Sequence, residues 1–240
     1  HDLIFFWVAR MILMSQYLLG EIPFQNVYFH GIVRTADGKK MSKSLGEKAI
    51  DPLDIIAKYS NDALRMAMII GNTPGNDLKL NENDIRGYGK FTNKVWNASR
   101  FVIQQTKDLD IKNLPTLDEE DKKNDEELKN LVREISKEMN EFRFSIVAEK
   151  LYHYFWHTFA DILIERSKKK ILPARNASGI ADAGGENKNS DSAKALLFTH
   201  LITLLKVLHP FIPFITEEVW SLLPTENKKL LMVEKWPNDN

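Results

Sequence analysis

A short loop with several lysines and two hydroxyls is the part of the sequence best suited to chemistry. It runs from Asp37 to Gly46 and reads DGKKMSKSLG. Its lysines are compact cations on flexible stems, so they can hold the phosphates of a nucleotide while charge moves onto a leaving pyrophosphate. Gly38 and Gly46 permit backbone angles that other residues avoid, so the segment between them can swing. The alternative for an arbitrary loop of this composition is a solvated basic turn.

A strand and two short helices are expected to position this loop. Residues 26–34 are rich in β-branched and aromatic residues and predict a strand that leads into the loop. Ligands of α/β sheets lie beyond the carboxyl ends of the strands, which is where the loop would fall. The sequences Asp51-Pro52 and Ser60-Asn61-Asp62 are typical helix starts and predict two helices that brace the loop, the second reaching Gly71.

Helices are predicted on both sides of this region. Residues 2–19 are apolar on nearly every face and predict a mostly buried helix that ends at Gly20. After a turn at 72–76, a helix from about Asn81 to Gln105 has the apolar stripe Phe91, Val95, Ala98 and Val102. Further helices are expected from a capping box of Thr116 and Glu119 to Phe142, over 143–171 with Phe144, Val147, Leu151, Phe155, Ile162 and Leu163 buried, over 196–208, and from 213 to 223. Residues 173–195 read as a flexible loop.

Composition limits the classes of protein that this chain can belong to. It has 240 residues, 43% of them hydrophobic, which is enough for one large core or two smaller ones. There is no cysteine, which excludes disulfides and cysteine-ligated zinc and is compatible with the cytoplasm. No apolar run reaches membrane-spanning length. The formal net charge is zero, so any contact with nucleic acid must come from local basic patches.

Five consecutive residues of the loop and several longer segments resemble the class I aminoacyl-tRNA synthetases. Residues 40–44 read KMSKS, the signature of that class. The segments VYFHGIVRTADGK and LGEKAIDPLDIIAKYSNDALRMAM flank the loop, and NTPGND, NKVWNASRF and HPFIPFITEEVW follow later. Together they are more similar to the valyl type than to its isoleucyl and leucyl relatives. The resemblance covers nearly the whole chain and is weakest over 173–195.

The resemblance implies roles for particular residues in a reaction that joins valine to ATP and then to tRNA. It implies that Lys40 and Lys43 approach the phosphates of ATP, which would arrive with Mg²⁺, and that the backbone around His30 and Gly31 lies beside the adenine. The nucleotide-binding residues implied by the same motif are His30, Gly31, Met41, Ser42, Lys43 and Ser44. Leu3 and Trp7 would line the pocket for the amino-acid side chain, although apolar residues at this spacing are equally expected to be core.

The second half of the chain resembles an anticodon-binding domain. In that family an α-helical bundle reads unstacked bases by stacking and hydrogen bonds, and the backbone by charge. The candidate residues are Lys90, Phe91, Lys94 and Arg100, where an aromatic ring lies among cations. The alternative is that Phe91 belongs to the core and the cations form a solvated face.

A metal site is a competing interpretation of the longest helix. Glu149, His153, His157, Asp161 and Glu165 recur at every fourth position. Each step of four drifts by about 40° around a helix, so the series spirals and does not converge on one ion. A polar stripe along an exposed helix face is therefore predicted, and no metal.

The fold class expected from these features is mainly α. Residues 1–76 are predicted to be the C-terminal part of a Rossmann-like α/β catalytic domain, and 77–240 an antiparallel helical bundle. The HIGH motif that accompanies KMSKS is absent, so the chain is expected to be a C-terminal portion of a larger, monomeric enzyme and inactive alone. The alternatives are a fragment of an isoleucyl- or leucyl-type synthetase and a tRNA-binding module without catalysis. ATP-pyrophosphate exchange with valine and isoleucine separates them.

Overall fold

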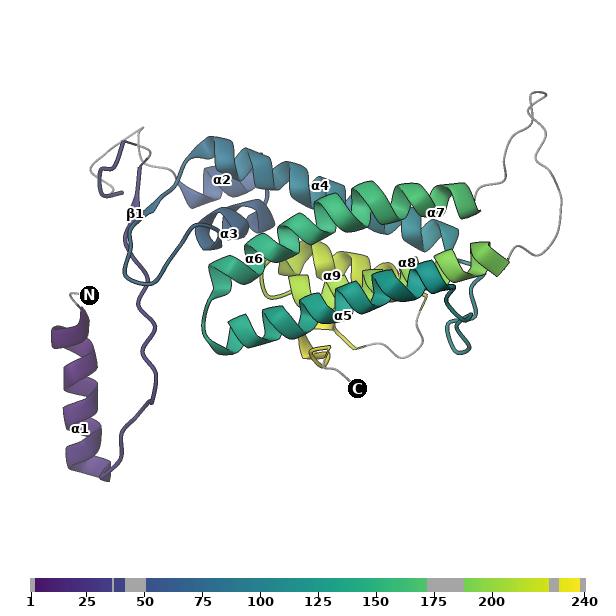
Figure 1. The fold of residues 1–240 in the computed structure, drawn as a ribbon. Coiled ribbons are helices and arrows are strands. Elements are labelled where there is room, and N and C mark those ends of the chain that lie inside the picture. Colours follow the sequence, from purple (N-terminus) through teal and green to yellow (C-terminus); the bar gives the residue numbers. More distant parts are fainter. Residues whose placement is uncertain (1–2, 36, 42–50, 172–187, 225–228, 238–240) are drawn as a thin grey trace. The chain divides into compact units, whose positions relative to one another are not determined.

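The computed structural model shows a mostly helical chain, as predicted, and describes residues 3–35, 37–41, 51–171, 188–224 and 229–237 (Figure 1). Its residues form two compact units, each described here by itself. The first comprises residues 1–50 and 71–81, and the second comprises 51–70 and 82–240. Among the described residues, no helix is long and apolar enough to cross a membrane.

The first unit contains a helix and a very small sheet. A π-helical segment, Ile4–Val8, continues into α1 (Ala9–Leu19), which ends as predicted at Gly20 in the left-handed conformation, with φ 74°. Strand β1 (Val33–Arg34) pairs in parallel with β2 (Leu78–Lys79). The strand predicted over 26–34 is thus confirmed only at its end, because 26–32 form no ladder with a neighbouring strand among the described residues.

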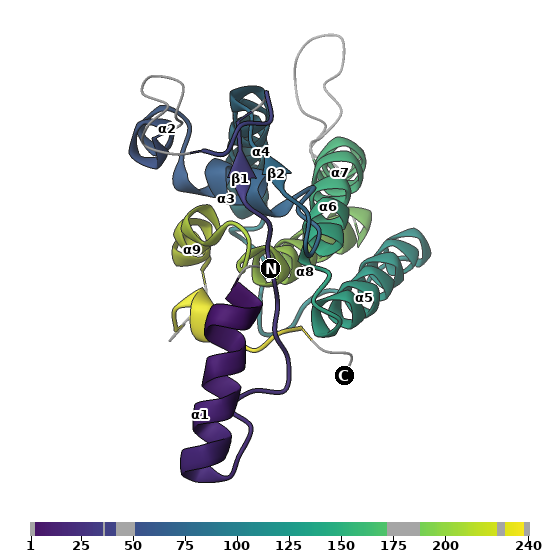
Figure 2. The ribbon, with the colours of Figure 1, turned by 90° about the vertical axis from the view of Figure 1, so that its left-hand side faces the viewer.

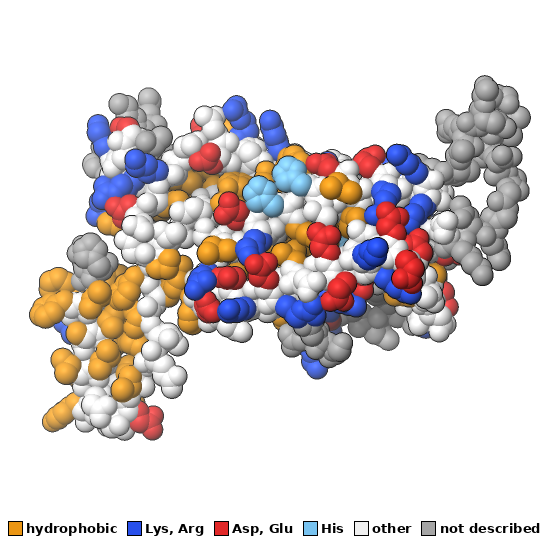
Figure 3. Space-filling model, viewed as in Figure 1, with side chains coloured by type: hydrophobic (Ala, Val, Ile, Leu, Met, Phe, Trp, Pro, Cys, Tyr) orange, Lys and Arg blue, Asp and Glu red, His pale blue; other side chains and the backbone are white. Residues whose placement is uncertain are grey.

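The N-terminal helix is exposed, and the prediction that it is mostly buried was wrong for this structure. None of its side chains is buried. Its orange hydrophobic surface contrasts with the mixed Lys, Arg, Asp and Glu surface of the helical unit (Figure 3). Its apolar residues extend around the helix, and within the part of the chain that is described they find no core to enter.

The second unit begins with the two short helices whose starts were predicted. Helix α2 (Pro52–Lys58) is capped by the Asp51 carboxylate, which accepts the N–H of Leu53 at 2.8 Å. Helix α3 (Asn61–Ile69) is capped by Ser60, whose hydroxyl accepts the N–H of Ala63. Bracing of the loop by these helices stays a prediction, because residues 42–50 lie outside the described part.

The remaining helices follow in the predicted order, with three corrections to the details. They are α4 (Glu82–Gln105), α5 (Glu119–Asn140), a continuous helix made of α6 (Phe144–His153), the π-helical η3 (Tyr154–Leu163) and α7 (Ile164–Ile171), then α8 (Lys188–Leu208), α9 (Pro213–Leu222) and a short 3-10 turn at Leu231–Val233 (Figure 1). First, Ile162 is exposed and not buried, because it lies about 100° around the helix from the buried Leu163.

The other two corrections concern helix starts. No capping box of Thr116 and Glu119 begins α5, because the carboxylate of Asp118 caps it by accepting the N–H of Asp121 at 2.8 Å. Residues 188–195 of the expected flexible loop are helical, since α8 begins at Lys188. Ala193 and Ala195 are buried there, so packing decides the conformation of a segment whose composition suggested a loop.

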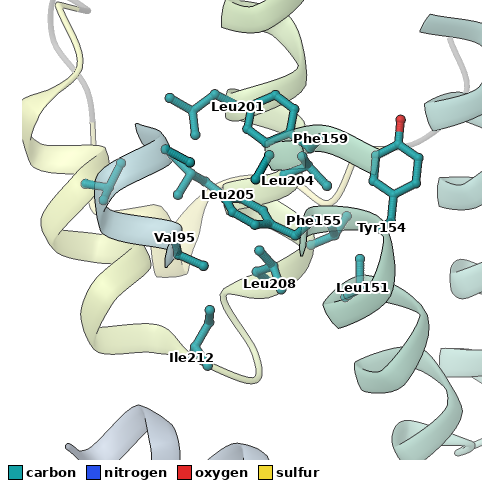
Figure 4. Close-up of a cluster of buried hydrophobic side chains, with 14 of the residues drawn as sticks. Val95, Leu151, Tyr154, Phe155, Phe159, Leu201, Leu204, Leu205, Leu208 and Ile212 are labelled. Carbon is teal, nitrogen blue, oxygen red and sulfur yellow. The ribbon is translucent and has the colours of Figure 1, made fainter. Parts of the chain in front are cut away.

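One continuous hydrophobic core holds the helical unit together (Figure 4). The predicted stripe of α4, namely Phe91, Val95, Ala98 and Val102, is buried in it. Leu151, Phe155 and Phe159 enter it from the long helix, and Leu201, Leu204, Leu205 and Leu208 from α8. The buried face of α4 therefore fixes which of its residues remain outside.

Polar groups inside this unit join helices that are distant in sequence. Asp121 has a side chain that is 1% exposed, and it accepts from Arg166 at 3.0 Å and from the Ser192 hydroxyl at 2.6 Å. Asp62 accepts the backbone N–H groups of Phe214 and Ile215 at the start of α9. Burial raises the pKa of Asp62, and these two N–H groups oppose that shift.

His200 in α8 is fully buried, stacks on Phe159 with ring centroids 6.3 Å apart, and has no hydrogen-bond partner on either ring nitrogen among the described residues. Burial lowers its pKa to about 4. The unfolded chain therefore binds more protons than the folded one between about pH 4 and 6.5, so the stability from a neutral His200 is lost as the pH falls.

We expect the free energy of unfolding to fall by up to about 3 kcal/mol between pH 6.5 and 4 from this residue alone. Urea unfolding of wild type and His200→Leu across this range measures it, and the variant should show a flatter pH dependence. The pH dependence of His209→Gln is measured for comparison, because burial also lowers the pKa of His209 and this residue contributes to the same pH range. An equal pH slope in wild type and His200→Leu contradicts the prediction.

Candidate functional site

The turn that precedes the KMSKS residues is held by hydrogen bonds from both of its ends. Thr35 donates its backbone N–H to Lys39 O at 2.9 Å, and Gly38 donates to Thr35 O at 2.8 Å with φ 84°. Met41 N–H then returns to Val33 O at 3.2 Å. The buried Thr35 hydroxyl accepts the N–H of Lys39. A tight hairpin thus follows the carboxyl end of β1 and exposes Lys39 and Lys40.

Asp77 anchors this hairpin to the second strand segment. Its carboxylate accepts the backbone N–H of Ile32 at 2.8 Å and the Arg34 guanidinium at 2.5 Å. These two contacts, the N–H first, lower the pKa of Asp77. The guanidinium of Arg34 also donates to Gly38 O in the turn at 3.2 Å. Arg34 therefore connects the paired strands with the hairpin.

Only part of the predicted nucleotide site lies in the described residues. Lys40 is exposed and Met41 half-buried, whereas Ser42, Lys43 and Ser44 lie outside the described part. His30 is exposed, and its Nδ1 is 2.9 Å from Gly31 O. Among the described residues, no three potential ligands from His, Cys, Asp and Glu gather to hold a metal ion.

Gly31 lies where two backbone segments meet. A Cβ atom built at this position would be 1.8 Å from the carbonyl oxygen of Asn76. The same segments are joined by the hydrogen bond from Gly75 N–H to Phe29 O. A steric requirement for glycine therefore exists here independently of any nucleotide.

Leu3 and Trp7, predicted to line an amino-acid pocket or to be core, are 57% and 61% exposed. They lie one turn apart on the N-terminal helix, so their side chains are on the same side of it. The core alternative does not hold for the described part of the chain.

The predicted RNA-binding residues of α4 have different surroundings. Phe91 is fully buried against Tyr152, Phe155 and Trp156, so it belongs to the core and offers no exposed ring to an RNA base. Lys94 pairs with Asp161 at 2.7 Å, and its amine lies 5.7 Å from the ring centre of Trp156. Lys90 and Arg100 are exposed.

Sequence reasoning missed a second pairing of a cation with a ring on the same side of the unit. Lys168 of α7 lies 5.2 Å from the ring centre of the half-buried Phe101. The signal in the sequence is the basic run 168–170 at the end of the long helix, whose charge also complements the helix dipole. Cations near aromatic faces are one arrangement that suits stacked bases and their phosphates.

The series Glu149, His153, His157, Asp161 and Glu165 is exposed along the long helix, which confirms the predicted polar stripe. The rings of His153 and His157 stack with centroids 5.6 Å apart. They line an open groove of about 620 Å³ between α5 and the long helix, crossed by an ion pair between Lys150 and Glu134.

Comparison with known proteins assigns the chain to a family. Residues 121–240 match the anticodon-binding domain of tRNA ligases, and residues 1–81 match the class I tRNA synthetases for I, L, M and V. The chain therefore belongs to the class I tRNA synthetases, of which it carries the anticodon-binding domain.

Similarity to individual proteins is consistent with this class. The chain is 38% identical over its whole length to a valine–tRNA ligase of Aquifex aeolicus, covering 21% of that protein. It is 39% identical to a valine–tRNA ligase of Clostridium acetobutylicum, with 99% of the chain and 26% of the relative covered. The chain thus spans about a fifth to a quarter of the length of these relatives.

Two solved structures share the fold. A ternary LeuRS–tRNA–LeuAMS complex of Agrobacterium radiobacter K84 superposes with a TM-score of 0.69 at 18% identity, over 95% of this chain and 26% of the other. A Mycobacterium tuberculosis methionyl-tRNA synthetase bound to methionyl-adenylate gives a TM-score of 0.65 at 16% identity, over 91% and 42%. At these identities the likeness concerns the fold alone.

The close approach at Gly31 leads to a testable prediction. Gly31→Ala should destabilise the protein by about 1–3 kcal/mol, because the new methyl group meets the backbone of Asn76 and not a flexible side chain. Denaturant unfolding measures the change. Gly87→Ala is the matched control: it lies in α4 with open space around it and should be neutral or stabilising by up to about 1 kcal/mol. Equal stability of both variants contradicts the steric argument.

Proposed function

We propose that this chain is part of a ligase that activates valine with ATP and attaches it to its tRNA. The observation that carries the proposal is the exposed Lys40 on a hairpin beyond the carboxyl end of a parallel strand, directly followed by the rest of KMSKS. Ligands of parallel sheets bind at this end. Similarity to valine–tRNA ligases over the whole chain favours valine over isoleucine or leucine as the substrate.

In the proposed reaction the valine carboxylate attacks the α-phosphate of ATP and pyrophosphate leaves. Lys40 and Lys43 stabilise the negative charge that develops on pyrophosphate. This interaction strengthens as the bond to the α-phosphate breaks, so it lowers the energy of the transition state more than that of bound ATP. Met41, Ser42 and Ser44 complete the loop around the phosphates, and the backbone at His30 and Gly31 lies beside the adenine. Mg²⁺ enters with ATP as part of the substrate. Leu3 and Trp7 contact the valine side chain.

The division of labour along the chain is part of the same proposal. Residues 1–76 would be the end of a Rossmann-like catalytic domain and 77–240 an antiparallel bundle that binds the anticodon region. The two compact units divide the chain differently, because residues 51–70 belong to the helical unit. Asp62 and Arg65 of α3 hold them there through hydrogen bonds with the backbone of 210–215. Residues 51–70 would therefore move with the RNA-binding helices. The enzyme would act as a cytoplasmic monomer.

Binding of tRNA is proposed for the cations of α4, with the half-buried Lys94 as the central residue. Its amine lies over the Trp156 ring and beside Asp161, so it is held at a fixed place on the surface. Lys90 and Arg100 extend the charge along the helix. Lys168 over Phe101 adds a second cation and ring. Such groups attract the RNA backbone and offer faces for unstacked bases.

Lys43→Ala in the full-length enzyme should lower the rate of valine-dependent ATP-pyrophosphate exchange by roughly 100-fold, because one charge contact to the developing pyrophosphate is lost. Valine binding, measured by calorimetry without ATP, should be largely unchanged. Lys39→Ala, the neighbouring exposed lysine outside KMSKS, is the control. Weakened valine binding with normal exchange kinetics rejects the proposed role.

Lys94→Ala should weaken binding of the valine tRNA transcript and make the dependence of log Kd on log salt shallower by about one unit, since one phosphate contact is lost. Filter binding between low and physiological salt measures both. Lys137→Ala, an exposed lysine on α5, should leave both unchanged. The same slope for Lys94→Ala and wild type contradicts the assignment.

A further inference from the structure

The outer face of α4 carries a stripe of polar and basic residues without any acid. The stripe consists of Arg86, Lys90, Asn93, Asn97 and Arg100, which are all exposed. Their spacing of four and three residues places them on one side of the helix, opposite the buried Phe91 and Val95. At about 1.5 Å per residue the stripe is about 21 Å long. From residue 85 to 105 the helix contains no Asp or Glu.

Such a stripe suits the backbone of an RNA strand. Lys and Arg side chains stand out along the edge where α4 runs (Figure 3). Arg86 lies near the start of the helix and is not among the cations of the proposed function, whereas Lys90 and Arg100 belong to both. Charge of one sign on one face gives a local attraction that the zero net charge of the chain would not suggest.

A pocket of about 330 Å³ opens beside this stripe, and its lining residues come from α4, α9 and the junction of α2 and α3. These four helices are labelled in Figure 2. Asn93 belongs both to the stripe and to the wall of the pocket. The other lining residues are Tyr59, Ser60, Asp62, Thr92, Trp96, Phe214, Ile215 and Glu218. Trp96 is half-buried and Phe214 is 59% exposed, so two aromatic side chains border a space that is open to solvent.

The polar groups of the pocket divide into those already satisfied and those at the rim. Asp62 accepts two N–H groups of α9, Tyr59 donates its hydroxyl to Glu82, and Thr92 donates to Gly89 O. The side chains of Asn93 and Glu218 are exposed at the rim. The pocket therefore combines apolar walls with an amide and a carboxylate at its entrance, a composition typical of ligand sites.

We propose that this pocket receives an unpaired base of the RNA whose backbone lies along the stripe of α4. Phe214 and Trp96 supply apolar and aromatic surface for the base, and Asn93 joins the two parts of the site. The inference rests on the proposed binding of tRNA and adds a second contact to it, on the α9 side of α4.

Glu218 narrows the kind of base. A carboxylate near a phosphate backbone is repelled, so it weakens binding unless it accepts a hydrogen bond from the ligand. The exocyclic amino groups of cytosine, adenine and guanine can donate to it, whereas uracil has only its ring N3–H to donate. The pocket should therefore favour a base that carries an amino group.

Footprinting on the full-length protein tests this. With the valine tRNA transcript, at least one unpaired C, A or G should be protected from dimethyl sulfate or kethoxal, reagents that attack the base edge. Phe214→Ala and Glu218→Gln should lose this protection and bind the transcript about 5-fold or more weakly, as for a lost stacking or base contact. Arg86→Ala and Lys90→Ala should each make the salt slope shallower by about one unit.

Matched controls are available on α5, where Glu127→Gln and Lys137→Ala alter exposed residues of the same charge. They should keep the protection, the affinity and the slope of the wild type. Phe214→Leu separates stacking from folding, because it keeps an apolar side chain at this exposed position: protection should be lost while far-UV circular dichroism is unchanged. Unchanged protection in the Phe214 and Glu218 variants of a protein that still binds the transcript overturns the pocket alone. Absence of transcript binding by the wild type overturns the proposed function as well.

Discussion

Burial of one face of α4 is the constraint on which the helical unit depends. Phe91, Val95, Ala98 and Val102 are inside because they pack against the long helix and α8. A rotation of α4 by one residue would bring polar side chains into the core, either Lys90, Lys94 and Asn97 or Thr92 and Ser99. The same geometry determines the outside: with the apolar stripe fixed, Arg86, Lys90 and Arg100 must face solvent. The core and the basic surface are therefore two consequences of one helical period. A substitution that disturbs the first would also displace the second.

Polar contacts decide how the helices end and which of them move together. The carboxylate of Asp118 caps α5 and receives the amine of Lys170, and Asp121 in the first turn holds Arg166 and Ser192. Both acids lie at the positive end of a helix dipole, which adds to their stabilisation by cations. At the other end of the unit, Asp62 plays a related part by accepting the first N–H groups of α9. These contacts bring 51–70 into the helical unit, although the chain leaves it for 71–81 before α4 begins.

Local signals in the sequence predicted most helices, and the errors occurred where distant residues decide. Asp51 and Ser60 cap helices by accepting N–H groups two or three residues further along the chain, so these helix starts could be predicted from the local sequence. The start of α5 was misplaced because Asp118 is stabilised by Lys170 and Ser192, which no local pattern announces. Residues 188–195 were predicted to be a loop from their composition, whereas hydrogen bonds of Ser192 with Asp118 and Asp121 hold this segment at the start of α5. The strand over 26–34 was overestimated because strand formation needs a partner, and β2 offers two residues.

The candidate sites divide in the same way. The lysine loop was found from the order of its residues, and Gly38 adopts one of the backbone angles that were expected to require glycine there. The pocket between α4 and α9 could not be predicted from the order of residues in the sequence. Trp96 and Phe214 come together only because Asp62 of α3 binds the start of α9. The acid-free stretch 85–105, in contrast, is readable in the sequence once the inner stripe is known. The carboxylate of Glu218 then indicates what the ligand must offer. The neighbouring face of α4 carries only positive charge, so an acid at the rim of the pocket is an exception on this surface. It is suited to accept a hydrogen bond from a donor group on the ligand.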